Sequence, residues 1–93
     1  MKVRWTTAAE QGRDGIVNHI ATNNPRAALK MDRLFRDAAA KLAEFPKMGK
    51  SGKIPGTREV IPHENYRIVY EIDEDTVWIL TLIHTARQWP PLE

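Results

Sequence analysis

Three arginines and a histidine in the second half of the chain are the residues best suited to chemistry: Arg58, Arg67, Arg87 and His84. Arginine presents a fixed fork of donors that matches phosphate oxygens, and histidine can transfer a proton near neutral pH. Metal-free cleavage of RNA needs such a set, because a base must remove the ribose 2′-OH proton, cations must stabilise the phosphate, and an acid must protonate the leaving 5′-oxygen. No neighbouring set of His, Asp and Glu has the form of a metal site, so we predict neither a metal nor another cofactor.

These side chains can act together only where the fold brings them to one surface. Short segments rich in Val, Ile, Tyr, Trp and Thr cover residues 58–61, 66–72 and 76–83, and polar turns separate them. This composition and its period of two predict three consecutive antiparallel strands. His84 then lies at the end of the last strand.

The lengths of the turns determine which side chains are neighbours. If the first loop has four residues, Arg58 pairs with Val69, and if Glu74-Asp75 is a two-residue turn, Arg67 pairs with Leu82. Opposed residues of an antiparallel pair point to the same face. We therefore expect one face of the sheet to carry Arg58, Arg67 and His84, with Arg87 just beyond. No carboxylate joins them as a general base, because Glu59 alternates to the other face. The assignment depends on the turn lengths, since a shift of one residue in either turn would move the side chains of that strand to the opposite face.

Two helices are predicted before these strands. Thr7 to Glu10 has the form of a capping box and begins a helix that ends near Asn23, weakened by Gly12 and Gly15. Asn24 suits the N-cap of a second helix and Pro25 its first position. The second helix continues to Pro46 with apolar residues spaced three and four apart. Because almost no loop joins the helices, they fold back as an antiparallel hairpin.

The fold class that follows is α/β, more narrowly α+β, in the order β-α-α-β-β-β. A strand over Lys2–Trp5 opens the chain, and the helical hairpin packs on one face of a small, mostly antiparallel sheet, leaving the other face open. We predict a single domain over residues 1–93, and whether the terminal Leu92-Glu93 is native or a cloning remnant is left open.

Residues 47–56, called the lysine loop below, hold three glycines, one proline and three lysines. This composition is typical of a flexible basic loop, which is often only solvated. Because clusters of lysine supply affinity for polyanions, we predict that Lys50 and Lys53 bind RNA. The chain has no cysteine, no long apolar run and no signal-peptide core, so we expect a cytoplasmic protein that does not enter a membrane.

Several stretches of the sequence resemble the RelE/ParE toxins of bacterial toxin–antitoxin pairs. They are Thr57–Ile61, Tyr66–Tyr70 and Ile79–His84 followed by Arg87, together with Asn24-Pro25 at the bend of the helix pair and Leu42–Pro46 at its end. The resemblance covers nearly the whole chain. It implies a toxin fold and one of two activities, since RelE- and YoeB-like members cut mRNA on the ribosome and ParE-like members poison DNA gyrase.

Arg67 favours the first activity, because the RelE and YoeB branches have arginine there and ParE sequences have an uncharged residue. We therefore predict a ribosome-dependent mRNA endoribonuclease in which Arg67 holds the scissile phosphate, Arg58 and Arg87 are auxiliary cations and His84 is the general acid. Trp89 stands where relatives often have tyrosine, and its indole can stack on a base without donating the proton. The ribosome would supply the orientation that this incomplete site lacks, which can contribute about 7–11 kcal/mol.

The alternative is a ParE-like gyrase inhibitor that acts by protein binding without catalysis, and a third possibility is a degenerate toxin that binds only its antitoxin. The partners implied are a cognate antitoxin with an acidic, partly disordered segment, and the ribosome with its mRNA or, in the alternative, DNA gyrase.

Overall fold

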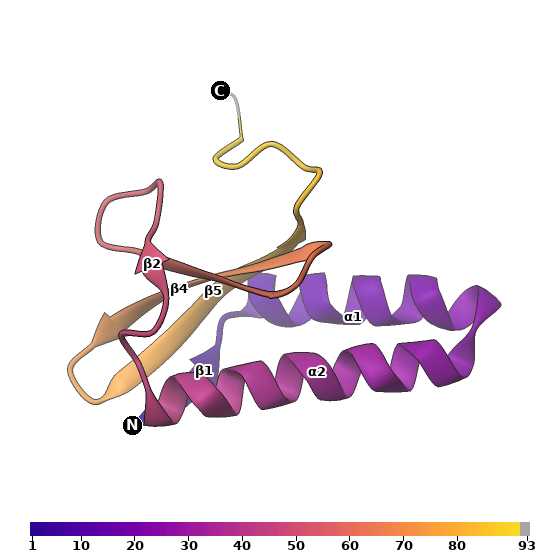
Figure 1. The fold of residues 1–93 in the computed structure, drawn as a ribbon, viewed down its shortest axis with the longest axis horizontal. Coiled ribbons are helices and arrows are strands. Elements are labelled where there is room, and N and C mark those ends of the chain that lie inside the picture. The colour runs from indigo at the N-terminus through magenta and orange to yellow at the C-terminus, as the bar shows by residue number, and fades with distance from the viewer. Residues whose placement is uncertain (92–93) are drawn as a thin grey trace.

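The helices and strands follow the predicted order, with one short strand added. The computed structural model describes residues 1–91. The elements are β1 (Lys2–Trp5), α1 (Thr7–Asn23), α2 (Pro25–Glu44), β2 (Lys50–Ser51), β3 (Arg58–His63), β4 (Tyr66–Asp73) and β5 (Thr76–His84). The helical hairpin covers one face of the sheet, which confirms the α+β class (Figure 1). The added strand β2 lies within the lysine loop, and the question about Leu92-Glu93 lies outside the described residues.

The sheet has five strands in the order β1-β5-β4-β3-β2. After β1 the chain passes out along α1 and back along α2, then starts again at the far edge with β2. Antiparallel pairing of β2, β3, β4 and β5 brings the chain back across the sheet, so that β5 ends beside β1 and parallel to it. Within residues 1–91, no helix combines the length and the hydropathy that a bilayer span requires.

Each helix begins at a side-chain cap. The Thr6 hydroxyl accepts the Ala9 N–H at 3.1 Å and donates to the Leu80 carbonyl at 2.9 Å, so it fastens α1 to β5. The predicted cap at Thr7 was therefore wrong by one residue, because contact with the sheet selects the preceding threonine. At α2 the prediction is confirmed, since Asn24 Oδ1 accepts the Ala27 N–H at 3.1 Å.

The core lies between α2 and the centre of the sheet. Phe35 and Leu42 of α2 are fully buried, and burial of each contributes about 1.5–3 kcal/mol. The sheet supplies the facing side chains Ile68, Tyr70, Val77, Ile79 and Leu82. The face of β4 and β5 that carries these residues is therefore the helix-facing face.

Gly12 lets α1 lie close to β5. A Cβ atom at this position would be 2.7 Å from the Leu82 carbonyl oxygen, whereas one at Gly15 would have nothing within 4 Å. Gly12, which the sequence marks only as a weak point of the helix, is required by tertiary packing.

Candidate functional site

A β-bulge in β5 determines which residues of this strand share a face of the sheet with Arg67. The strands β4 and β5 begin to pair as predicted at the Glu74-Asp75 turn. The register then shifts by one residue where Leu80 is left without a partner on β4. Beyond the shift, Arg67 lies opposite Ile83 and not opposite Leu82.

The same bulge separates Arg67 from His84. His84 lies opposite Tyr66, whose ring packs edge-on against Phe35 of α2 with centroids 5.4 Å apart. This residue pair is therefore on the helix-facing side, whereas Arg67, the next residue after Tyr66, points away from the helices. The prediction that Arg67 and His84 share a face is wrong, because one inserted residue reverses every side chain beyond it.

Arg58 is also displaced from the predicted arrangement. It lies opposite Tyr70 rather than Val69, because the register of β3 and β4 shifts between Val60 and His63. Pro62, which has no N–H to donate, lies in this irregular stretch. The Arg58 guanidinium donates from Nη1 to the carbonyl of Gly49 at 2.8 Å and to that of Lys47 at 3.3 Å. Arg58 thus lies on the helix-facing side, away from Arg67, and its hydrogen bonds hold the backbone of Lys47 and Gly49.

Arg67 faces a buried carboxylate. Its Nε lies 3.4 Å from Glu59 Oε1, and the two side chains are only 14% and 2% exposed. The Arg67 Nε is buried without a hydrogen-bond partner, so the contact is an ion pair and not an aligned hydrogen bond. Glu59 shares the face of Arg67 because the shift in β3 moves it there, and much of the charge of Arg67 is therefore balanced inside the protein.

A row of three rings on the helix-facing side was missed from the sequence. His63, Tyr66 and His84 lie on adjacent strands, with ring centroids 5.7 Å apart for His63 and Tyr66 and 5.4 Å for Tyr66 and His84. Each histidine Nδ1 accepts the backbone N–H two residues later, that of Asn65 at 3.1 Å or of Ala86 at 3.0 Å. This leaves Nε2 of each ring as the nitrogen that can donate a hydrogen bond. A two-residue turn at 64–65 would have placed His63 beside Tyr66, whereas His84 comes beside Tyr66 only through the bulge at Leu80.

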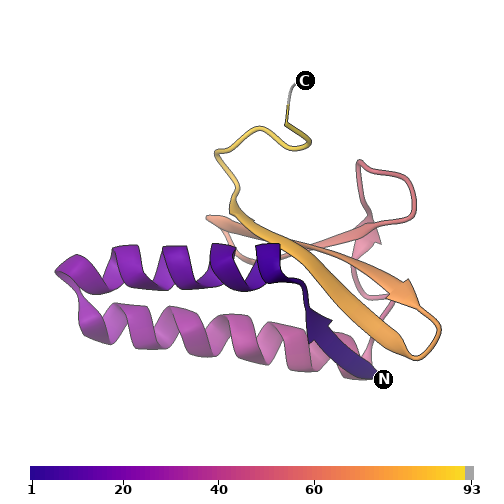
Figure 2. The same cartoon turned by 180° about the vertical axis from the view of Figure 1, so that it is seen from behind.

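The C-terminal segment lies on the side of the sheet away from the helices (Figures 1 and 2). Arg87 is exposed, and its N–H donates to the His84 carbonyl at 3.0 Å. Trp89 is half-buried, and its indole Nε1 is buried without a hydrogen-bond partner. Val69, which shares the face of Arg67, is 1% exposed. The centre of this face is covered, so the prediction of an open face is wrong there.

The lysine loop is built around a buried tyrosine hydroxyl. Tyr70 Oη accepts the Gly49 N–H at 2.9 Å and donates to the Pro46 carbonyl at 2.7 Å. Burial raises the pKa of Tyr70, and this outweighs the lowering by the Gly49 hydrogen bond and by the charge of Arg58. Lys50 and Lys53 extend from this loop and are exposed. Their contact with RNA stays a prediction, as do the catalytic roles of Arg58, Arg67, His84 and Arg87.

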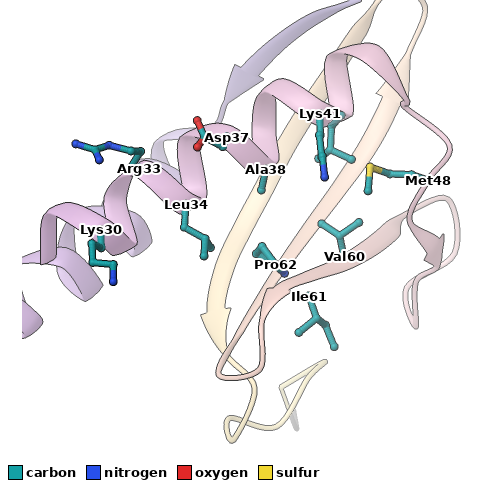
Figure 3. Close-up of a pocket in the computed structure, with 11 residues that line it drawn as sticks. Lys30, Arg33, Leu34, Asp37, Ala38, Lys41, Met48, Val60, Ile61 and Pro62 are labelled. Carbon is teal, nitrogen blue, oxygen red and sulfur yellow. The ribbon is translucent and has the colours of Figure 1, made fainter. Parts of the chain in front are cut away.

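An apolar groove with a cationic rim runs between α2 and β3 (Figure 3). This α2–β3 groove encloses about 470 Å³, and its apolar lining is Leu34, Ala38, Leu42, Met48, Val60, Ile61 and Pro62. Lys30, Arg33 and Lys41 of α2 stand at its rim with one acid, Asp37. Ile61 and Met48 are 47% and 52% exposed, although both are apolar. Neither in the groove nor anywhere else in residues 1–91 do three His, Asp or Glu side chains lie close enough to hold a metal ion.

Comparison with known proteins identifies the class. A helical hairpin on one face of such a sheet, with the sequence motifs above, defines a toxin of the RelE/ParE superfamily. Residues 3–89 match the family described as the ParE toxin of type II toxin–antitoxin system, parDE. The chain belongs to this ParE toxin family, and the family implies a cognate antitoxin as partner.

Two curated relatives are similar over nearly their full length. Y4kP of Sinorhizobium fredii, which is named as a toxin, is 38% identical over 96% of this chain and 93% of its own. Toxin RelE2 of Caulobacter vibrioides is 31% identical over 92% of this chain and 97% of its own. Of these two names, only that of RelE2 refers to a branch of the superfamily.

Solved structures show the same fold at low sequence identity. A chain of the chromosomal ParDE system from P. aeruginosa matches with a TM-score of 0.79 and 20% identity, over 90% of this chain and 95% of its own. A copper-bound mutant toxin from Helicobacter pylori matches with a TM-score of 0.67 and 16% identity, over 92% and 96%. At these identities the likeness concerns the fold.

Proposed function

We propose that this toxin arrests growth by binding a protein target, DNA gyrase, and that it has no catalytic site of its own. The observation that carries the proposal is the separation of Arg67 from His84 on opposite faces of the sheet, with Arg67 paired to buried Glu59. A phosphate held by Arg67 would lie across the sheet from the proton donor, which cannot then reach the leaving oxygen. Membership of the ParE family supports the same target. Gyrase is a cytoplasmic enzyme, so the proposed place of action is the cytoplasm.

The antitoxin partner is proposed to place an acidic amphipathic segment, partly disordered when free, in the α2–β3 groove. The groove has an apolar floor, and Lys30, Arg33 and Lys41 outnumber the single acid Asp37 at its rim. Apolar anchors of a helix would bury the exposed Ile61, while its acidic residues would face the three cations. A segment that folds on binding suits such a groove, because ordering and docking occur together.

A supercoiling assay with purified gyrase tests the proposed target. The full-length toxin, separated from its antitoxin, is expected to inhibit supercoiling and to trap cleaved DNA on gyrase, and the antitoxin is expected to reverse both effects. In growing cells, induction is expected to raise the SOS response before mRNA ends change. A toxin that arrests growth while gyrase remains fully active would contradict the proposal.

His84→Gln separates binding from catalysis, with Thr85→Ser as a matched control beside it. His84 is exposed, so its replacement is expected to leave the fold and gyrase inhibition unchanged. If His84→Gln abolishes growth arrest in a folded protein that still binds its antitoxin, the general-acid role gains support and the binding mechanism fails.

The ribosome-dependent endoribonuclease is the second candidate. It is favoured by the row of His63, Tyr66 and His84, in which two histidines could serve as acid and base. The test compares 5′ ends after incubation with naked mRNA and with programmed ribosomes at equal salt. Cuts within codons only on ribosomes would support this candidate over the gyrase proposal.

A further inference from the structure

The two ends of the lysine loop are fixed by contacts that do not involve Arg67. At the start, the Gly49 N–H donates to Tyr70 Oη, and the Gly49 carbonyl accepts from Arg58. Further along, the Gly52 N–H donates to the Thr57 carbonyl at 2.8 Å, and at the end the Thr57 N–H donates to the Ile54 carbonyl at 3.1 Å. These contacts set where the loop leaves and rejoins the sheet.

The middle of the loop is held by the Glu59 carboxylate. Its Oε2 accepts the Lys53 N–H at 3.0 Å, and its Oε1 faces Arg67 Nε at 3.4 Å. With its side chain 2% exposed, Glu59 receives little solvation from water. One buried carboxylate therefore connects the Arg67 side chain to the backbone of Lys53.

The carboxylate depends on Arg67 to remain both charged and buried. Without a nearby cation, a buried carboxylate is driven toward water, because an unpaired charge is costly to keep buried. This movement would break the bond from the Lys53 N–H to Glu59 Oε2. Removal of Arg67 is thus expected to release the backbone at Lys53, while the contacts of Gly49, Gly52 and Thr57 stay in place.

We infer that Arg67 is a positioning residue that acts through Glu59 to hold the lysine loop in the conformation that presents Lys50 and Lys53 to an anionic surface of the toxin's target. Both lysines are exposed, and Lys50 lies opposite Glu59 in the β2–β3 pair. This inference rests on the proposed function only for the identity of the target. With gyrase as target, the anionic surface is the bound DNA, whose phosphates attract such lysines.

Limited proteolysis of the full-length toxin tests the loop directly, because trypsin cleaves after Lys50 and Lys53. In Arg67→Met, cleavage after Lys53 is expected to be about tenfold faster or more, as follows from losing a hydrogen bond to a charged group. Cleavage after Lys50, which is paired in β2, is expected to change less. Exchange of the Lys53 amide hydrogen is expected to accelerate by a similar factor. Cleavage after Arg36, inside α2, reports global unfolding and serves as the internal reference.

The double variant E59Q/R67M separates positioning from direct contact. It removes both charges, and the glutamine oxygen can still accept the Lys53 N–H, so the loop is expected to recover slow cleavage. Ile16→Ala on α1, remote from the loop, controls for general destabilisation and is expected to raise cleavage at Arg36 and the loop alike. Unchanged loop cleavage in Arg67→Met, relative to Arg36, would overturn the inference.

Growth arrest after induction supplies the functional measurement and does not depend on which target is correct. Arg67→Met and the double variant K50A/K53A are both expected to weaken arrest, and E59Q/R67M to restore it. If E59Q/R67M regains the closed loop but not arrest, Arg67 contacts the target itself and the inference fails. If the wild-type toxin does not inhibit gyrase, the proposed function fails. Proteolysis and growth arrest then still test the role of Arg67.

Discussion

Replacing Tyr70 by phenylalanine tests how the segment after α2 is fastened to the sheet. Tyr70 is fully buried, and its hydroxyl bonds both the Gly49 N–H and the Pro46 carbonyl. The variant leaves the buried Gly49 N–H without an acceptor, which costs about 1–3 kcal/mol. The half-buried Pro46 carbonyl can form a hydrogen bond with water instead, so losing its bond to the Tyr70 hydroxyl costs less, about 0.5–1.5 kcal/mol.

Together the two losses amount to about 1.5–4.5 kcal/mol of the free energy of unfolding for Tyr70→Phe, with a central value of about 3 kcal/mol. For a domain of this size each kcal/mol corresponds to about 4–8 °C, so for the central value Tm is expected to fall by about 12–24 °C. Urea unfolding followed by tryptophan fluorescence measures the change, and the slope of free energy against urea should stay constant, because the core is otherwise intact.

Tyr66→Phe is the matched control. Within the described part of the chain the Tyr66 hydroxyl makes no hydrogen bond, while its ring packs on Phe35 and His84. The control is expected to change stability by less than about 0.5 kcal/mol. Equal stability of Tyr70→Phe and Tyr66→Phe would refute the reasoning, since it would mean that the two bonds to the Tyr70 hydroxyl contribute nothing net.

Three further outcomes are expected. Because burial raises the pKa of Tyr70, the folded state keeps a proton that the unfolded state loses near pH 10. The stability of the wild type should therefore fall as the pH rises above about 10, and that of Tyr70→Phe should fall less. Urea titrations from pH 8 to 11 would measure the difference. Gly12→Ala should lower Tm through a loss of about 1–3 kcal/mol in stability, because its Cβ meets the β5 backbone. Gly15→Ala, whose Cβ would lie in open space, should raise Tm slightly. A higher Tm for both variants would contradict the packing of α1 on β5. Ile61→Glu in the α2–β3 groove should weaken antitoxin binding at least about tenfold by calorimetry, while Leu29→Glu, exposed outside the groove, should not.

Local sequence signals determined the elements of this fold. The Asn24-Pro25 cap, the three-and-four spacing of α2 and the period of two after the lysine loop act over a few residues, so they can be recognised without the tertiary structure. The two-residue turn at Glu74-Asp75 was also predictable, because polar turn residues stand between two β-rich segments.

The faces of the sheet were decided by the tertiary structure. Leu80 is bulged where β5 meets β4, and no residue type near it announces a bulge, yet it places His84 on the helix-facing side and away from Arg67. The irregular stretch of β3 around Pro62 likewise brings Glu59 to Arg67. A bulge depends on how whole strands pack and twist, and one inserted residue reverses all side chains beyond it. The sequence alone therefore determined which residues carry charge, and packing decided which of them meet.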